Sequence, residues 1–200
     1  MKYIGKSIPK IDGYEKVTGT AKYTVDYTNK NMLHAKMLIS PHAHAKIKSI
    51  NIEKAKNMPG VKAVITGNDS PLLVGVLLED RPILARDKVR YHGEPVAVIV
   101  ANSELQAERA VQEIKVEYEE LPVINSAKEA FNSKVLVHEN MHNYRILKPL
   151  NPIPGTNVAN LVKIRKGNML KGWVESDFII EATFSLPQSD HVALETRNVR

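Results

Sequence analysis

The sequence predicts an α+β fold in which a mixed sheet packs with a few helices. Two observations support this class. First, apolar-rich runs of strand length occupy residues 32–40, 45–52, 61–66 and 95–101, while the helical patterns between them are short. Second, a polar turn from Asp87 leads into an apolar strand ending at Ala101, a helical pattern follows, and residues 115–122 form another strand. A strand, a helix and a strand in this order form the centre of the predicted domain.

The helical pattern after Ala101 has a clear beginning and one apolar face. Ser103 is a favourable N-cap residue, and Gln106 three positions later completes a capping box. The apolar stripe of this helix consists of Ala107, Ala110, Val111 and Ile114. A right-handed crossover is expected if the two flanking strands are parallel, but the sequence does not fix their direction.

The remaining segments are read from turn formers and alternation. Residues 32–40 suit a buried strand, 45–52 a strand with one wet face, 53–58 a short helix ended by Pro59 and Gly60, and 61–66 another strand. Further along, we expect a helix at 126–131, strands at 135–138, 161–167 and 177–186, and a helical turn at 168–173.

These segments predict four parts along the chain. Residues 1–20 form an extended lead-in, 21–145 the main domain, 146–157 a linker, and 158–200 the incomplete start of a second α+β domain. The linker is predicted because residues 147–155 hold three prolines and one glycine. The apolar strand predicted at 177–186 has nothing after it to pair with, and an unpaired apolar edge favours aggregation. We therefore expect the chain to be a piece of a longer protein.

Composition excludes several classes of site and partner. The chain has no cysteine, which excludes disulfides, thiolate zinc sites and cysteine-held iron–sulfur clusters. The net charge is +6, but lysines are spread among acids and aromatic residues are few, so nucleic acid is not an expected partner. Neither a signal peptide nor an apolar run of about 18 residues is present. We predict a cytoplasmic protein that does not enter a membrane.

Histidines offer the first candidate metal ligands. His42 and His44 are two residues apart, and His138 and His142 are four apart, as on one helix face. A metal site needs three or four converging ligands, and neither pair has a third. The other histidines, which we interpret as hydrogen-bonded surface or core residues, are isolated: His34, His92 and His191.

Carboxylates offer candidate acid–base groups. Glu117 and Glu119 share one face of a strand, and Glu120 lies on the opposite face with Tyr118. A solvated strand end facing lysines is the favoured interpretation. Glu94, before Pro95, is expected to accept hydrogen bonds from turn amides. Because no glycine-rich phosphate loop, dinucleotide fingerprint or nucleophile elbow is present, we predict no catalytic, cofactor-binding or metal residue in this chain.

Five separated segments resemble, in order, the start of the molybdenum-cofactor-binding large subunit of the xanthine dehydrogenase/aldehyde oxidase family. They are residues 5–24, 33–47, 58–61, 87–101 and 118–122. Together they are similar to the α/β hammerhead domain of that family. Beyond about Asn157, the pairs Gly167–Asn168 and Ile180–Glu181 resemble the first strands of the molybdopterin-binding region. Residues 191–195 resemble its first histidine–glutamate signature.

The resemblance implies an oxidoreductase that hydroxylates a purine, an aldehyde or an N-heterocycle with oxygen from water. It implies the molybdenum cofactor (molybdopterin) in the complete subunit, with electrons leaving through iron–sulfur and flavin subunits or domains. The family's cofactor-contacting glutamine, glycine-rich loop and catalytic glutamate would all follow Arg200. The implied role of this chain is therefore a scaffold without bound cofactor. It would contact the remainder of the large subunit, and homo-oligomers are possible in principle.

Two rival hypotheses belong to other classes. The chain could be a free-standing binding or assembly module that captures a partner along residues 177–195, and the downstream reading frame distinguishes this from a scaffold piece. A metal-binding protein that uses His42 and His44 is the other rival, and calorimetric titration with zinc or nickel tests it.

Overall fold

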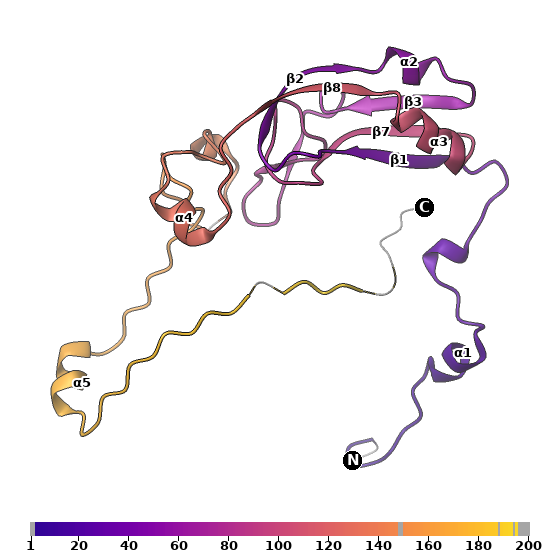
Figure 1. Cartoon of the computed structure of the whole chain (residues 1–200). Helices are drawn as coiled ribbons and strands as arrows, with labels where there is room; N and C mark the ends of the chain where they lie inside the picture. The colour runs from indigo at the N-terminus through magenta and orange to yellow at the C-terminus, as the bar shows by residue number, and fades with distance from the viewer. Residues whose placement is uncertain (1–2, 148–149, 188, 194, 196–200) are drawn as a thin grey trace. The chain divides into compact units, whose positions relative to one another are not determined.

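The computed structural model describes residues 3–147, 150–187, 189–193 and 195. The chain divides into two units. The larger unit is Leu33–Gly167, and the smaller consists of Met1–Met32 together with Asn168–Arg200. Figure 1 shows that all the long strands belong to the larger unit. The two units are described separately below.

A three-stranded antiparallel sheet, sheet A, forms one layer of the larger unit. Its strands are β1 (His34–Ile39), β7 (Pro95–Ala101) and β3 (Val61–Thr66), with β7 in the centre. Met37 of β1 and Ile65 of β3 both lie opposite Val98 of β7. The run predicted from residue 95 is therefore a central strand, which explains its nearly continuous apolar sequence.

A second antiparallel sheet, sheet B, contains β6 (Lys88–Val89), β2 (Ala45–Asn51) and β8 (Lys115–Glu120), with β2 in the centre. A two-stranded pair is formed by β4 (Leu73–Val74) and β5 (Arg81–Pro82). The α+β class is confirmed. Every strand pair among the described residues is antiparallel, so the parallel pairing that a mixed sheet implies is not found there. Because β7 and β8 belong to different sheets, the crossover rule does not apply to them.

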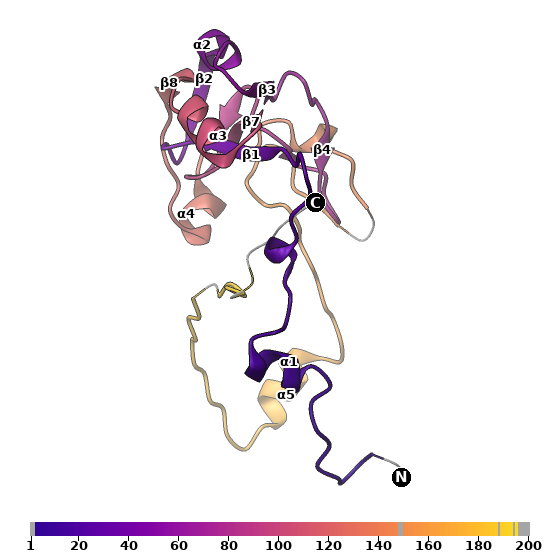
Figure 2. The same cartoon turned by 90° about the vertical axis from the view of Figure 1, so that its right-hand side faces the viewer.

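Helix α3 (Glu104–Val111) connects the two sheets and packs on sheet A, as Figure 2 shows. The predicted N-cap is confirmed, because Ser103 Oγ accepts a hydrogen bond from the Gln106 amide. The predicted apolar stripe is also confirmed: Ala107 and Ala110 are fully buried against Ile99 of β7, and Ile114 just beyond the helix joins them. Their small side chains allow close approach of the helix to the sheet. The short helix α2 (Glu53–Lys56) adds Ala55 to this core.

The segment after sheet B contains α4 (Ala127–Asn132), with Ser126 as its N-cap, and the 3-10 turn η2 (Met141–Asn143). The strand predicted at residues 135–138 is wrong. The side chain of Asn157 takes the place of a strand neighbour: its Nδ2 donates to the carbonyl oxygens of Ala130 (3.1 Å) and Val135 (2.9 Å), and its Oδ1 accepts from the Val137 amide (2.9 Å).

The same contacts involve the last residue of the predicted linker. Asn157 is the last residue of the predicted linker, and its side chain donates a hydrogen bond to the Val135 carbonyl oxygen within the larger unit, which continues to Gly167. Lys148 and Pro149 of the linker lie outside the described residues. The strand predicted at residues 161–167 is wrong, because these residues pair with no strand among the described residues. The predicted domain limits stay a prediction.

The smaller unit holds α1 (Gly13–Thr18), the 3-10 turn η1 (Thr24–Asp26) and α5 (Met169–Glu175). The lead-in expected to be extended thus contains a helix, which ends at Gly19 with φ of 71°, a left-handed cap that glycine adopts readily. The predicted helical turn at 168–173 is confirmed as α5 with Asn168 as N-cap. The strand predicted at 177–186 is wrong, because none of the residues that the structure describes forms a ladder with this segment. Part of the segment 191–195 and residues 196–200 lie outside the described residues.

Candidate functional site

Five ionisable side chains lie close together where residues 136–144 contact β6 and the residues after it. This polar cluster consists of Lys88, Arg90, His138, Glu139 and Tyr144. Lys88 is only 6% exposed, although ammonium groups are rarely buried. Its Nζ donates to Glu139 Oε1 at 2.7 Å and to the Leu136 carbonyl oxygen at 3.4 Å. These two acceptors compensate for the loss of hydration of the buried charge.

Arg90 attaches the same segment from one side. Its Nε donates to the Val137 carbonyl oxygen at 3.1 Å, and its Nη1 donates to the Lys88 carbonyl oxygen at 3.2 Å. Both acceptors are backbone atoms, so these hydrogen bonds of the guanidinium fix the course of the main chain and do not form an ion pair with a carboxylate. The polar cluster therefore fastens residues 136–144 to β6.

His138 and Tyr144 form the only pair in the described cluster that resembles an acid–base couple. His138 Nδ1 lies 3.0 Å from the Tyr144 hydroxyl oxygen. Burial, and then the positive charge of Arg90, lower the pKa of His138 from 6.5 to about 4. Burial raises the pKa of Tyr144. Since both shifts favour the neutral forms, proton transfer from Tyr144 to His138 is opposed, and the pair is a structural hydrogen bond.

The turn that enters β7 is closed by a buried carboxylate. Glu94 Oε2 accepts a hydrogen bond from the Arg90 amide at 2.5 Å, as expected from the sequence. Burial raises the pKa of Glu94, while the hydrogen bond from the Arg90 amide acts in the opposite direction. Gly93, with φ of 86°, donates its amide to the Ser40 carbonyl oxygen, and the Ser40 amide donates back to the Glu94 carbonyl oxygen. This turn fixes the register between β1 and β7.

A cavity of about 180 Å³ lies beside the polar cluster. Its lining residues carry both signs of charge, with Arg86 and Arg90 against Asp80 and Asp87, and they also include Tyr144. Ligand pockets usually measure roughly 300–1,000 Å³ and are mostly apolar. This small, charge-balanced cavity does not have the form of such a pocket.

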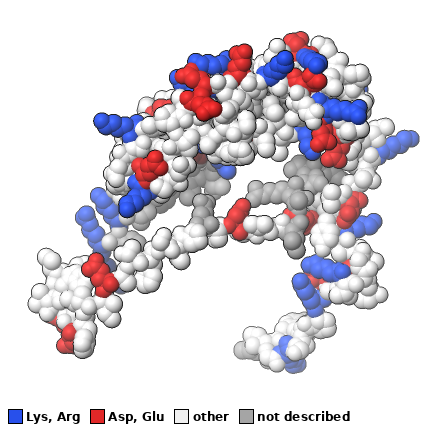
Figure 3. Space-filling model, in the orientation of Figure 1, with Lys and Arg blue, Asp and Glu red and all other residues white. Residues whose placement is uncertain are grey.

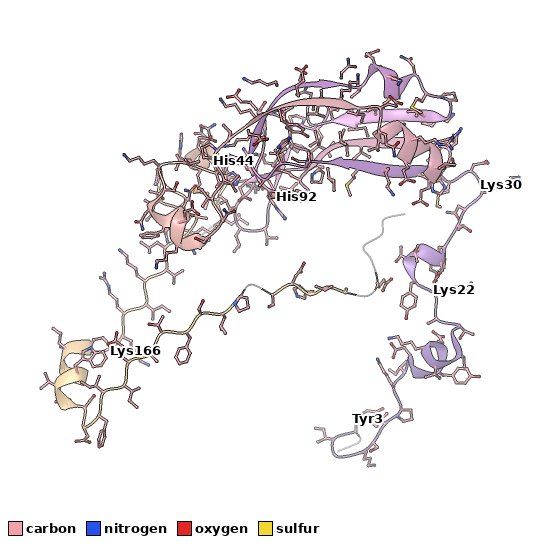
Figure 4. All side chains as sticks on the ribbon, in the orientation of Figure 1. Tyr3, Lys22, Lys30, His44, His92 and Lys166 are labelled. Carbon is pink, nitrogen blue, oxygen red and sulfur yellow. The ribbon has the colours of Figure 1, made fainter. Side chains whose placement is uncertain are left out.

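The two histidines of the first pair make different contacts, and Figure 4 labels His44. His44 is buried at the start of β2, and its Nδ1 lies 2.6 Å from the Pro122 carbonyl oxygen. Because a carbonyl only accepts, Nδ1 carries the proton, and Nε2 is left without a partner among the described residues. His42 instead packs on the Tyr118 ring and lies 3.5 Å from Glu120 Oε1.

The remaining histidines are dispersed. His34 begins β1, His92 is exposed in the turn before β7 (Figure 4), His142 is exposed in η2, and His191 is exposed beside Asp190. His138 and His142 make no common contact that the structure shows. Among the described residues, no group of three histidine, cysteine, aspartate or glutamate side chains converges as a metal site would require.

The carboxylates of β8 face the basic residues of β2. The Glu119 carboxylate forms an ion pair with the Lys48 ammonium, and its Oε1 lies 3.9 Å from Lys46 Nζ. The hydrogen bond from Lys48 lowers the pKa of Glu119, and the nearby charge of Lys46 adds to this effect. Glu117 accepts a hydrogen bond from Ser49 Oγ at 2.8 Å. These are contacts across a wet strand pair, and they do not enclose a substrate.

Sequence reasoning missed the two residues that organise the cluster. Lys88 stands in a short polar stretch before β7, and only its alternation with the buried Val89 could have indicated a strand. Asn157 sits among turn formers, and its side-chain hydrogen bonds reach residues more than twenty positions away. No local pattern signals such contacts.

Residues 18–122 match the family model "Aldehyde oxidase and xanthine dehydrogenase, a/b hammerhead domain". The chain belongs to the aldehyde oxidase and xanthine dehydrogenase family and carries its hammerhead domain.

Curated relatives match nearly the whole chain. The chain is 36% identical over 188 residues to a probable xanthine dehydrogenase subunit of Bacillus subtilis, covering 92% of this chain and 23% of the relative. It is 34% identical over 200 residues to the xanthine dehydrogenase molybdenum-binding subunit of Escherichia coli O157:H7, covering 94% and 25%. The chain therefore spans about a quarter of the length of these relatives.

Solved structures show the same fold. Quinoline 2-oxidoreductase from Pseudomonas putida 86 is 37% identical, with a TM-score of 0.62, over 68% of this chain and 19% of that chain. Aldehyde oxidoreductase from Desulfovibrio gigas is 33% identical, with a TM-score of 0.58, over 65% and 16%. None of the helices in the described part of the chain is long and apolar enough to cross a membrane.

Proposed function

We propose that this chain is the N-terminal, non-catalytic scaffold portion of a xanthine dehydrogenase/aldehyde oxidase-type molybdenum hydroxylase large subunit. The observation that carries the proposal is the hammerhead match over residues 18–122 in a chain that spans only about a quarter of its relatives. The complete enzyme would hydroxylate a purine, an aldehyde or an N-heterocycle with oxygen derived from water.

The described residues of this chain do not fit the cofactor that the family implies. The buried side-chain atom left without a partner in the described residues is Nε2 of His44, and one imidazole nitrogen inside a packed turn cannot hold a pterin. The cavity beside the polar cluster is small and balanced in charge. The molybdenum cofactor would thus bind elsewhere in the complete subunit, and this chain alone would carry none.

The contribution of the chain would be mechanical. Three sets of contacts connect the parts of the larger unit: the closed turn at Glu94, the packing of α3 on β7, and the hydrogen bonds from Lys88 and Arg90 to residues 136–144. A module connected in this way at the front of a long subunit provides surfaces for its neighbours. We place the remainder of the large subunit first among these, and iron–sulfur and flavin subunits or domains second, in the cytoplasm.

The test replaces the matching part of a relative by this chain. The residues of the Escherichia coli xanthine dehydrogenase molybdenum-binding subunit that match this chain are replaced by the chain, and the fusion is purified with the other subunits of that enzyme. We expect the fusion to bind molybdenum and oxidise xanthine, while the isolated chain does neither.

Two results would overturn the proposal. One is turnover of xanthine by the isolated chain, or a pterin that copurifies with it in a 1:1 ratio. The other is a fusion that fails to assemble, since a scaffold of this family must support a related subunit.

A further inference from the structure

One face of sheet A is mostly apolar, and the exposed Lys62 lies beside it in the β-bulge of the edge strand β3. The side chains of Ala35, Met37 and Ile39 on β1, Val98 and Val100 on β7, and Ala63 and Ile65 on β3 lie on the side opposite α3. We call these seven residues the outer face of sheet A. Met37 is 56%, Ile39 50% and Ile65 37% exposed. Val98 and Val100 in the central strand are also only partly buried, so no described segment of the larger unit covers this face.

Sheet B provides an internal comparison. Its inward side chains, such as Ile47 and Val116, join the core, and its outward side chains include Lys46, Lys48 and Glu119. Figure 3 shows charged side chains gathered along the border of the larger unit that β2, β8 and α2 occupy. Sheet B thus follows the usual pattern of an antiparallel sheet, with one apolar and one wet face. Sheet A, in the same unit, instead exposes apolar side chains such as Met37 and Ile65 on the face opposite α3.

The outer face of sheet A therefore has the character of a protein-contact surface. A contiguous apolar surface on a folded unit marks an interaction site, because leaving it in water forfeits the hydrophobic free energy of burial. We infer that the outer face of sheet A docks on the remainder of the large subunit, through an uncharged apolar surface of that polypeptide. This inference rests on the proposed function and specifies which surface performs it.

Two observations select this occupant. The relatives contain about three quarters of their length beyond what this chain covers, so a large polypeptide is available to cover the face. The seven residues also include no lysine, arginine or carboxylate, so a charged partner surface would lose its hydration over them without gaining an ion pair. The nearby Lys62 lies on the edge strand β3 and not in the centre of the face. An uncharged surface from the same subunit meets both conditions.

The experiment uses two variants with equal changes in charge. Met37→Glu combined with Ile65→Glu places two carboxylates on the outer face of sheet A and changes the net charge by about −2. Lys115→Glu, at the exposed start of β8, changes it by the same amount on sheet B. Each is introduced into the isolated chain and into the Escherichia coli fusion described above.

We expect the double variant to lower the yield of assembled, molybdenum-containing fusion by roughly tenfold or more, because burying two carboxylates in an apolar interface is strongly unfavourable. Lys115→Glu should stay within about twofold of the unsubstituted fusion. In the isolated chain, the double variant should keep the circular dichroism spectrum and melting temperature, since its sites are exposed.

The outcomes separate the two proposals. If the unsubstituted fusion assembles and the double variant assembles equally well, the docking inference is overturned and the proposed function stands. If the unsubstituted fusion fails, both are overturned. Unfolding of the isolated double variant would show that the face supports the fold itself. A dimer of the isolated chain in sedimentation experiments that the double variant converts to monomer would assign the face to a second copy. Each of these last two results also overturns the inference.

Discussion

Acid should destabilise the chain through His138. His138 and His142 lie four residues apart on the same segment, but His138 is half-buried against Tyr144 and His142 is exposed. The positive charges of Arg90 and Lys88 and the negative charges of Asp80 and Glu139 all act on His138, and burial outweighs each of them. His138 is therefore neutral in the folded state at pH values where an unfolded histidine takes up a proton.

The sign and size follow from linkage. The folded pKa of His138 is lowered from 6.5 to about 4, so the stabilising effect is complete above pH 6.5 and is lost as the pH falls toward 4. The full difference between these pKa values corresponds to about 3.4 kcal/mol. Because the ring is partly open to solvent, we reduce this to roughly 1–2 kcal/mol.

The assay is urea unfolding of the isolated chain at pH 7 and pH 4.5, followed by circular dichroism. His138→Gln should lose roughly 1–2 kcal/mol less than the unsubstituted chain between these pH values, and His142→Gln should match the unsubstituted chain. A proton NMR titration should place the His138 ring near its low pKa. Parallel losses of stability in all three proteins would show that His138 ionises freely, and the burial argument would fail.

Three further predictions concern the attachments of the larger unit. Asn157→Ala removes three hydrogen bonds and should cost roughly 2–4 kcal/mol in urea unfolding; a cost below about 0.5 kcal/mol would mean that residues 130–137 hold their path unaided. Glu139→Gln should destabilise more than Lys88→Met, by roughly 1–2 kcal/mol, because only the first leaves a buried ammonium without its carboxylate; the reverse order in thermal melting would contradict this. Gly67→Ala should cost about 2 kcal/mol or more, because its new Cβ would lie 2.6 Å from the Ala85 carbonyl oxygen, whereas Gly172→Ala meets open space and should be neutral or slightly stabilising.

The success of sequence reasoning differed between the two halves of the chain. From residue 32 to 120, apolar runs bounded by turn formers predicted the long strands, and capping residues predicted α3, because these features depend on neighbours within a few positions. Beyond residue 133 the same patterns predicted strands that do not form. A strand is stable only with a hydrogen-bonded neighbour, and a single segment cannot reveal whether a neighbour exists.

The interpretation of the candidate sites followed the same division. The sequence correctly indicated that Glu94 accepts a hydrogen bond from a turn amide and that acids of β8 face lysines, since both are local relations. It could not indicate that Lys88 is buried or that Asn157 joins α4 to Val137, since these contacts link residues about 20 to 50 positions apart. The absence of catalytic, cofactor-binding and metal residues stays a prediction.

The amino-acid sequence by itself determined the α+β class, the beginning of α3 and the family, because residue pattern and segment order are properties of the chain alone. The tertiary structure decided which strands are neighbours, and thereby which side of each strand meets water. Apolar residues at positions 37, 98 and 65 are compatible in sequence with either a covered or an open face. The surroundings of a side chain depend on the elements that fold around it. The pairing of β1, β7 and β3 on one layer leaves that face open.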